Sequence, residues 1–125
     1  MACQQSKKET DKLSMSQASK TDVMPSGKYK LSFIELGSVR CIPCRQMQKV
    51  IKSVKQEYGN EVRTIFIDVV EKEGKPYAEL FKINTIPVQV FLDKQGKEVY
   101  RHEGYLSKEE VYMVLNKNGI SKSLK

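Results

Sequence analysis

The sequence is poor in several features that would point to particular classes of protein. It has no tryptophan, one histidine and three cysteines among 125 residues. Three cysteines are too few for a scaffold held by several disulfides. No apolar run approaches the roughly 18 residues that a membrane span needs. A secretory signal is also incomplete, because Lys7, Lys8 and Glu9 come early and no apolar stretch follows them.

The composition suits a single globular domain. Hydrophobic residues make up 39% of the chain and charged residues 30%, a balance typical of a chain that buries one core. The formal net charge is +7. Such a charge can favour acidic partners or anionic membrane surfaces, but we assign most of it to the solvated surface. No nucleic-acid-binding motif accompanies this charge. We therefore expect no nucleic-acid partner, and we expect a monomer.

Two regions of the chain differ in composition. Residues 1–27 are rich in Ser, Lys, Gln and Thr and contain few apolar side chains, so we expect a disordered polar tether. Residues 28–125 carry regular apolar patterns and are expected to form the folded domain. Whether the tether adds a strand to the domain stays open at this point.

The apolar patterns of the second region predict seven elements in the order strand, helix, strand, helix, strand, strand, helix. Ser107 and Glu110 match a capping box, which marks the start of the last helix. This order predicts an α/β domain with a central mixed sheet of four strands, or five if the tether joins it, and helices on both faces. The expected elements are a strand at 28–36, a helix at 44–58, a strand at 62–70, a short helix from 76, strands at 88–92 and 98–102, and a helix after 107.

Two of the cysteines form the segment Cys41-Ile42-Pro43-Cys44, between the first strand and the first long helix. Unpaired N–H groups and the helix dipole stabilise a thiolate at a helix N-terminus, where Cys41 is expected. Pro43 suits the first helical turn, because its missing donor costs little there. Cys44 is expected one turn inside the helix, shielded but within bonding reach. The segment predicts one exposed nucleophile and one resolving thiol.

The same cysteine spacing also occurs in zinc sites, which normally use four ligands. The additional thiol and imidazole are those of Cys3, on the tether, and His102, on a late strand. A zinc site would therefore require the tether to fold back. A static structural disulfide between Cys41 and Cys44 is the other alternative. We favour neither, and we expect no metal and no cofactor.

Four features of the chain carry a family resemblance, and together they are more specific than the cysteine pair alone. They are Phe33-Ile34-Glu35-Leu36 ahead of the cysteine pair, the strand Ile65-Phe66-Ile67-Asp68-Val69, the segment Ile83-Asn84-Thr85-Ile86-Pro87, and the hairpin from Phe91 to Glu98 followed by Gly104 and the last helix. With these features, the segment from Lys30 to Asn118 resembles the thioredoxin family, including its extracytoplasmic members.

The resemblance implies a thioredoxin fold and a role for several residues. Cys41 would attack a substrate disulfide, and Cys44 would resolve the mixed disulfide. Pro87 would lie beside the cysteines with a cis peptide bond, and the backbone of Ile86 would pair with the substrate chain. Glu35 stands where thioredoxins carry a buried acid, and a carboxyl buried there would have a raised pKa and could relay the proton of Cys44. The alternative is a strand-end glutamate that reaches solvent.

The sequence also departs from the family around the cysteine pair. Arg40 stands where thioredoxins usually have tryptophan, Phe66 replaces a lysine that commonly neighbours the buried acid, and Val88 stands where threonine is frequent. A guanidinium beside Cys41 should favour its thiolate and make the protein more oxidising than a typical thioredoxin. The alternative is that Arg40 points into solvent and only shapes the docking surface. Arg40, just before the first cysteine, and Ile42 and Pro43, between the two cysteines, would contact the substrate.

The resemblance favours a protein-disulfide reductase. The proline between the two cysteines resembles the reducing members of the family more than the oxidase and isomerase centres, which contain histidine. The partners of such a reductase would be disulfide-containing proteins and an upstream electron donor. The alternatives are a disulfide oxidase or isomerase, and a binding module that uses the thioredoxin fold without catalysis.

The first residues of the chain suggest a location. Ala2-Cys3 is similar to the end of a lipobox, in which a small residue precedes the lipidated cysteine. Because a polar tether follows, we expect an extracytoplasmic, membrane-anchored lipoprotein with Met1 as an expression start. The alternative is a cytoplasmic protein in which Cys3 is incidental.

Overall fold

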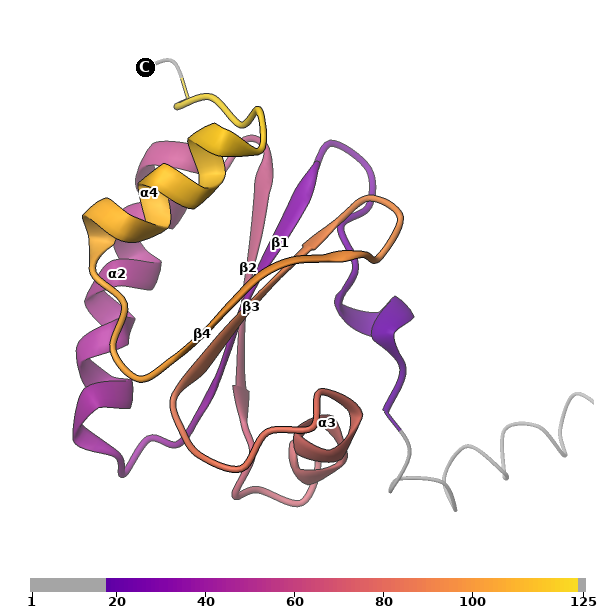
Figure 1. The fold of residues 1–125 in the computed structure, drawn as a ribbon, viewed down its shortest axis with the longest axis vertical. Coiled ribbons are helices and arrows are strands. Elements are labelled where there is room, and N and C mark those ends of the chain that lie inside the picture. Colours follow the sequence, from indigo (N-terminus) through magenta and orange to yellow (C-terminus); the bar gives the residue numbers. More distant parts are fainter. Residues whose placement is uncertain (1–17, 124–125) are drawn as a thin grey trace, which may run out of the picture.

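The computed structural model describes residues 18–123. Figure 1 shows a central sheet with helices packed around it. The predicted order of seven elements is observed, preceded by a short 3-10 helix, η1, that the sequence analysis did not predict. The elements are η1 (Lys20–Val23), β1 (Leu31–Gly37), α2 (Ile42–Tyr58), β2 (Val62–Asp68), α3 (Lys75–Leu80), β3 (Val88–Asp93), β4 (Glu98–Glu103) and α4 (Lys108–Lys117).

The four strands form one mixed sheet in the order β2-β1-β3-β4. Strand β1 runs parallel to β2 and antiparallel to β3, and β4 returns antiparallel to β3 through the predicted hairpin. Every residue of β1 is buried, because this strand lies inside the sheet and helices cover both of its faces. The predicted α/β architecture with a mixed four-stranded sheet is confirmed.

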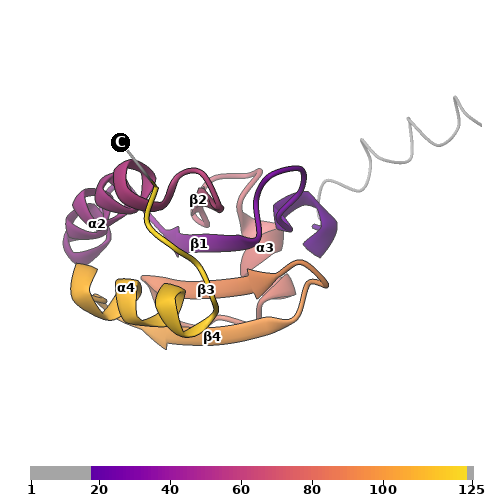
Figure 2. The ribbon, with the colours of Figure 1, turned by 90° about the horizontal axis from the view of Figure 1, so that it is seen from above.

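Helices α2 and α4 cover one face of the sheet, and α3 and η1 cover the other (Figure 2). Alternate residues of β1 contribute to the two cores. Phe33 stacks on Phe91 under α2 and α4, with 4.8 Å between the ring centroids. Ile34 and Leu36 pack into the core on the α3 side. Because Glu35 follows Phe33 by two positions, its side chain points toward α2, where the cysteine pair lies.

The first described residues dock on the domain. Ser19 caps η1 by accepting the backbone N–H of Thr21, and Val23 is buried in the core on the α3 side. The carbonyl of Met24 accepts a hydrogen bond from the Arg63 guanidinium at 2.8 Å. The tether was expected to extend to residue 27, whereas Asp22, Val23 and Met24 already contact the domain. The difference arises because one residue of this polar segment, Val23, packs on an apolar surface of the domain. Composition alone does not reveal such a contact.

The start of α4 has the predicted capping box. Ser107 Oγ accepts the backbone N–H of Glu110 at 3.1 Å, and Glu110 Oε1 accepts the backbone N–H of Ser107 at 3.2 Å. Two orphan donors of the first helical turn are thereby satisfied. The neighbouring Leu106 and Val111 are fully buried, so the cap fixes the helix against the core.

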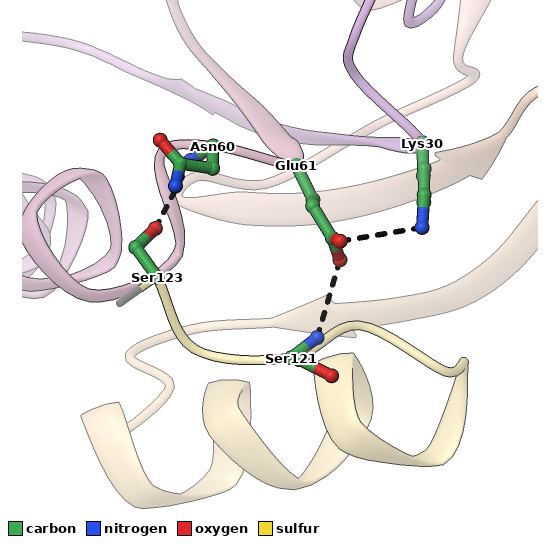
Figure 3. A network of polar contacts seen from close by, with 5 residues as sticks. All are labelled: Lys30, Asn60, Glu61, Ser121 and Ser123. Carbon is green, nitrogen blue, oxygen red and sulfur yellow. Dashed lines mark hydrogen bonds and ion pairs between the residues drawn. The ribbon is translucent and has the colours of Figure 1, made fainter. Parts of the chain in front are cut away.

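The segment after α4 is held by polar contacts with the turn before β2 (Figure 3). The Glu61 carboxylate accepts hydrogen bonds from Lys30 Nζ and from the backbone N–H of Ser121, each at 3.2 Å. The backbone N–H of Asn60 donates to Ser123 Oγ, also at 3.2 Å. Each contact at the surface adds little by itself, but together they hold the C-terminal segment against the start of β2.

Within residues 18–123, no helix is long and apolar enough to cross a membrane. Most of the expected tether, residues 1–17, lies outside the described residues, and Cys3 lies there too. The lipid anchor expected at Cys3 therefore stays a prediction. Within the described part of the chain, the N-terminal segment contributes η1 to the fold and no strand.

Candidate active site

The cysteine pair lies at the junction of β1 and α2. Cys41 is the N-cap residue of α2, and its Sγ accepts the backbone N–H of Cys44 at 3.4 Å. Pro43 lies in the first turn, as predicted. The helix begins at Ile42, earlier than predicted, because the Cys41 sulfur supplies an acceptor to the first turn. Both cysteines are free thiols, and the N–H aimed at Cys41 Sγ suits a negatively charged sulfur.

The two thiols differ in exposure. Cys41 is partly exposed, whereas Cys44 has only 1% of its surface exposed. Burial, followed by the hydrogen bond with Cys41, raises the pKa of the Cys44 thiol to about 12. Cys44 is therefore protonated at neutral pH and needs a base before it can act as a nucleophile.

Glu35 lies in β1 on the face that α2 covers, and its side chain is fully buried. Burial raises the pKa of its carboxyl from 4.5 to about 8, and a hydrogen bond from Gln89 offsets part of this rise. Nε2 of Gln89 donates to Oε1 of Glu35 at 3.1 Å. Oε2 of Glu35 has no hydrogen-bond partner among residues 18–123. The side chain does not reach solvent, so the burial expected for this acid is observed.

Gly37 lies beside both the carboxyl of Glu35 and the thiol of Cys44. A methyl group placed on Gly37 would be 2.8 Å from Cys44 Sγ and 3.4 Å from Glu35 Oε2. The sulfur and the oxygen therefore border the same small space. The two distances place the sulfur and the oxygen no more than about 6 Å apart, and Oε2 has no hydrogen-bond partner among residues 18–123, so a proton would pass between them through a bridging water molecule. A side chain larger than hydrogen at this position would occupy that space.

The peptide bond between Ile86 and Pro87 is cis, as the resemblance implies. Pro87 is buried, and its carbonyl accepts the backbone N–H of Gly104 at 2.7 Å. Ile86 is partly exposed and lines a shallow pocket of about 180 Å³ together with Asn84 and Thr85. The chain ahead of β3 therefore presents an open surface.

Apolar side chains are exposed around Cys41. Ile42 is 65% exposed and Val39 is 58% exposed, and Arg40 is exposed as well. A pocket of about 260 Å³ extends from Val39 to the buried Cys44. Exposed apolar groups that cluster beside a polar rim are typical of a protein-binding surface. The hypothesis that Arg40 favours a thiolate stays a prediction.

Gln89 is the residue of this site that the sequence analysis did not single out. The sheet register aligns Phe66, Glu35, Gln89 and His102 in one row across the four strands. A signal was present, because a glutamine within an apolar strand must find a buried hydrogen-bond partner. The partner was not predictable from local patterns, since Glu35 is 54 positions away in the chain.

Clusters of side chains that could bind a metal ion are absent from the described part of the chain. Within residues 18–123, no group of three or more His, Cys, Asp or Glu side chains could hold a metal ion. Nε2 of His102 lies 3.0 Å from the carbonyl oxygen of Tyr105. The zinc alternative also used Cys3, which lies outside the described residues.

Comparison with known proteins places these features in a family. The profile of the thioredoxin-like domain matches residues 16–119. Thioredoxin of Listeria monocytogenes is 32% identical over 77 residues, which cover 62% of this chain and 72% of that protein. Thioredoxin of Bacillus subtilis is 30% identical over 78 residues, with the same two coverages of 62% and 72%.

A solved structure agrees with the sequence comparison. The germline-specific thioredoxin Deadhead of Drosophila melanogaster superposes with a TM-score of 0.62 at 24% identity, over 70% of this chain and 80% of that chain. The fold is therefore the thioredoxin fold, as predicted. The chain belongs to the thioredoxin-like family, whose chemistry is thiol–disulfide exchange.

Proposed function

We propose that the protein is a protein-disulfide reductase in which Cys41 attacks the substrate and Cys44 resolves the mixed disulfide. The observation that carries this proposal is a partly exposed thiol at the N-cap of α2 with a buried thiol one turn behind it. The thioredoxin relatives support this class of reaction. Two electrons would pass from the protein dithiol to the substrate disulfide.

The reaction has two thiol–disulfide exchanges. In the first, the Cys41 thiolate bonds to one substrate sulfur, the substrate S–S bond breaks, and the other sulfur leaves as a thiolate that takes up a proton. In the second, the deprotonated Cys44 attacks Cys41 Sγ, so the Cys41–Cys44 disulfide forms and the substrate leaves as its second thiol. An upstream dithiol donor must then reduce the protein disulfide.

Glu35 is proposed as the base for the second exchange. Its Oε2 is buried without a partner among the described residues and borders the same space as Cys44 Sγ. A carboxyl whose pKa is about 8 can accept and return a proton near neutral pH. Such a base is needed because Cys44 is 1% exposed and burial raises the pKa of its thiol to about 12, so the thiol stays protonated at neutral pH.

The substrate is proposed to bind across the end of α2 and the segment before β3. Exposed apolar surface at Ile42 and the charge of Arg40 flank the nucleophile, and Pro43 lies on the same turn. The backbone of Ile86, next to Pro87, would pair with an extended substrate chain. These residues would recognise a disulfide in an exposed polypeptide segment.

Disulfide trapping and an insulin-reduction assay test the proposal. Wild type should reduce insulin in the presence of a dithiol donor, Cys41→Ser should be inactive, and Cys44→Ser should accumulate a mixed disulfide through Cys41. A matched control is Cys44→Ser combined with Cys41→Ser, which should trap nothing. Insulin reduction by Cys41→Ser at the wild-type rate would refute the assignment. A wild type that binds protein disulfides without turnover would favour the binding-module alternative.

The direction of electron flow is tested by the redox potential of the Cys41–Cys44 couple. Equilibration with glutathione should give a value in the range of reducing members, between that of thioredoxin, about −270 mV, and those of glutaredoxins, about −200 to −230 mV. A potential of about −180 mV or higher would favour the disulfide oxidase or isomerase alternative. Measuring Arg40→Ala in parallel tests whether the guanidinium makes the protein more oxidising.

We also propose that the domain acts outside the cytoplasm on a lipid anchor at Cys3. The support is the Ala2-Cys3 sequence and the polar segment that follows it. Labelling of the natural full-length protein with a radioactive fatty acid should be lost in Cys3→Ser. Labelling that persists in this variant would contradict the anchor.

A further inference from the structure

Gln89 is a fully buried amide in the middle of β3. It lies directly opposite Glu35 in the antiparallel pair of β1 and β3, so both side chains rise from the same face of the sheet. Its Nε2 donates to Glu35 Oε1 at 3.1 Å. Among residues 18–123, no other side chain donates a hydrogen bond to this carboxyl.

The hydrogen bond from Gln89 determines which oxygen of Glu35 is free. Oε1 is engaged, whereas Oε2 borders the space beside Gly37 that Cys44 Sγ also borders. On the other side of Glu35, the register partner is Phe66, which offers no donor. Without the amide, no polar side-chain contact from residues 18–123 would hold the carboxyl in this orientation.

We propose that Gln89 is a positioning residue that holds Glu35 so that Oε2 takes the proton of Cys44 in the resolving step. This inference rests on the proposed function. The proton moves from Cys44 Sγ to Oε2, the Cys44 thiolate bonds to Cys41 Sγ, and the bond between Cys41 and the substrate sulfur breaks. Glu35 then returns the proton to the departing thiolate or to solvent.

The amide also affects how readily Glu35 ionises. An N–H donor bonds more strongly to a charged oxygen than to a neutral one, so the amide stabilises the carboxylate and holds the pKa of Glu35 below the value that burial alone would produce. Loss of the donor should therefore shift the ionisation to higher pH. Fewer molecules would then carry the base at neutral pH.

Few titratable groups face Glu35 from the surrounding elements. Helix α2 contributes Cys44 and, one turn away, Cys41. Strand β2 places Phe66 opposite Glu35 and Asp68 opposite Gly37, on the same face of the sheet. The buried residues of α4 are apolar. Strand β4 contributes His102, with Gln89 between it and Glu35. A His102→Gln variant therefore separates any titration of the imidazole from that of the carboxyl.

The resolving step can be isolated with 5,5′-dithiobis(2-nitrobenzoate) in a stopped-flow experiment on the reduced full-length protein. The first release of thionitrobenzoate reports attack by Cys41, and the second reports resolution by Cys44. Gln89→Met keeps the length of the side chain and removes the donor. Ser32→Ala is a matched control, because Ser32 is a buried polar residue on the opposite face of β1.

We expect Gln89→Met to slow the second release about tenfold at pH 7 and to move its pH midpoint upward by about one unit. The first release should keep its wild-type rate, and Ser32→Ala should match wild type in both. In a Glu35→Gln background, adding Gln89→Met should change nothing further. His102→Gln should leave the midpoint in place.

Two results would overturn the role of Gln89. One is a wild-type second release in Gln89→Met, and the other is an equal slowing with and without Glu35, which would mean that the amide acts on the fold alone. A wild type that shows no second release at all would instead refute the proposed function.

A measurement on wild type keeps the inference testable if Gln89→Met does not fold. The side-chain ¹⁵N signal of Gln89 should titrate with the same midpoint as the carboxyl ¹³C signal of Glu35. Different midpoints would overturn the proposed coupling.

Discussion

Glu35→Gln removes a buried ionisable group and keeps the size of the side chain. Because burial raises the pKa of Glu35 from 4.5 to about 8, the folded state holds this proton more tightly than the unfolded state. The contribution of the group to stability is fully present below about pH 4.5 and is lost as pH rises toward 8. With about 1.4 kcal/mol for each pKa unit, the unfolding free energy at pH 7 should be about 3 kcal/mol lower than at low pH, because the carboxyl is ionised in the unfolded state and still mostly protonated in the folded state.

Urea unfolding of the reduced protein at pH 5 and pH 8.5 measures this effect. Between these values, wild type should lose about 4 kcal/mol of unfolding free energy through Glu35, whereas Glu35→Gln should not show this loss. Glu79→Gln, at an exposed position of α3, is the matched control and should follow wild type. If Glu35→Gln and wild type differ by the same amount at both pH values, the buried-acid argument is wrong.

Three further variants test the packing around the site and at the ends of the domain by chemical unfolding. Gly37→Ala should destabilise the fold by about 1–3 kcal/mol and slow the resolving step, because its methyl would meet Cys44 Sγ at 2.8 Å; wild-type values of both would contradict the close approach. Ser107→Ala should cost about 1 kcal/mol through the lost cap of α4, and an unchanged urea midpoint would contradict the cap. Val23→Ala should cost about 1–2 kcal/mol and speed proteolysis ahead of β1, since Val23 is buried against the α3-side core; wild-type stability would mean that η1 does not dock in solution.

Much of the fold could be predicted from short-range patterns in the sequence. The apolar stripe of α2, the alternation of the strands and the Ser107–Glu110 cap each depend on residues within a few positions of one another, so the order of elements was predictable. The two cysteines were placed at the start of α2 by the same kind of evidence. The helix begins slightly earlier than its stripe, since a cap residue need not be apolar.

Contacts between distant segments were not predictable in this way. The docking of Val23 on the α3-side core depends on the shape of a surface that several elements build together. The pairing of Glu35 with Gln89 depends on β3 being the antiparallel neighbour of β1 and on its register. A shift of that register by one residue would turn Gln89 to the other face of the sheet.

The sequence by itself determined that a pair of cysteines stands at the start of a helix, because their spacing and the proline between them act over one helical turn. It also placed an acid in the buried strand before them. Only the tertiary structure decided the state of that acid. The acid is buried, it contacts Gln89, and it shares the space beside Gly37 with Cys44. These three features depend on how β1, β3 and α2 pack together, and that packing is not encoded in any single segment of the chain.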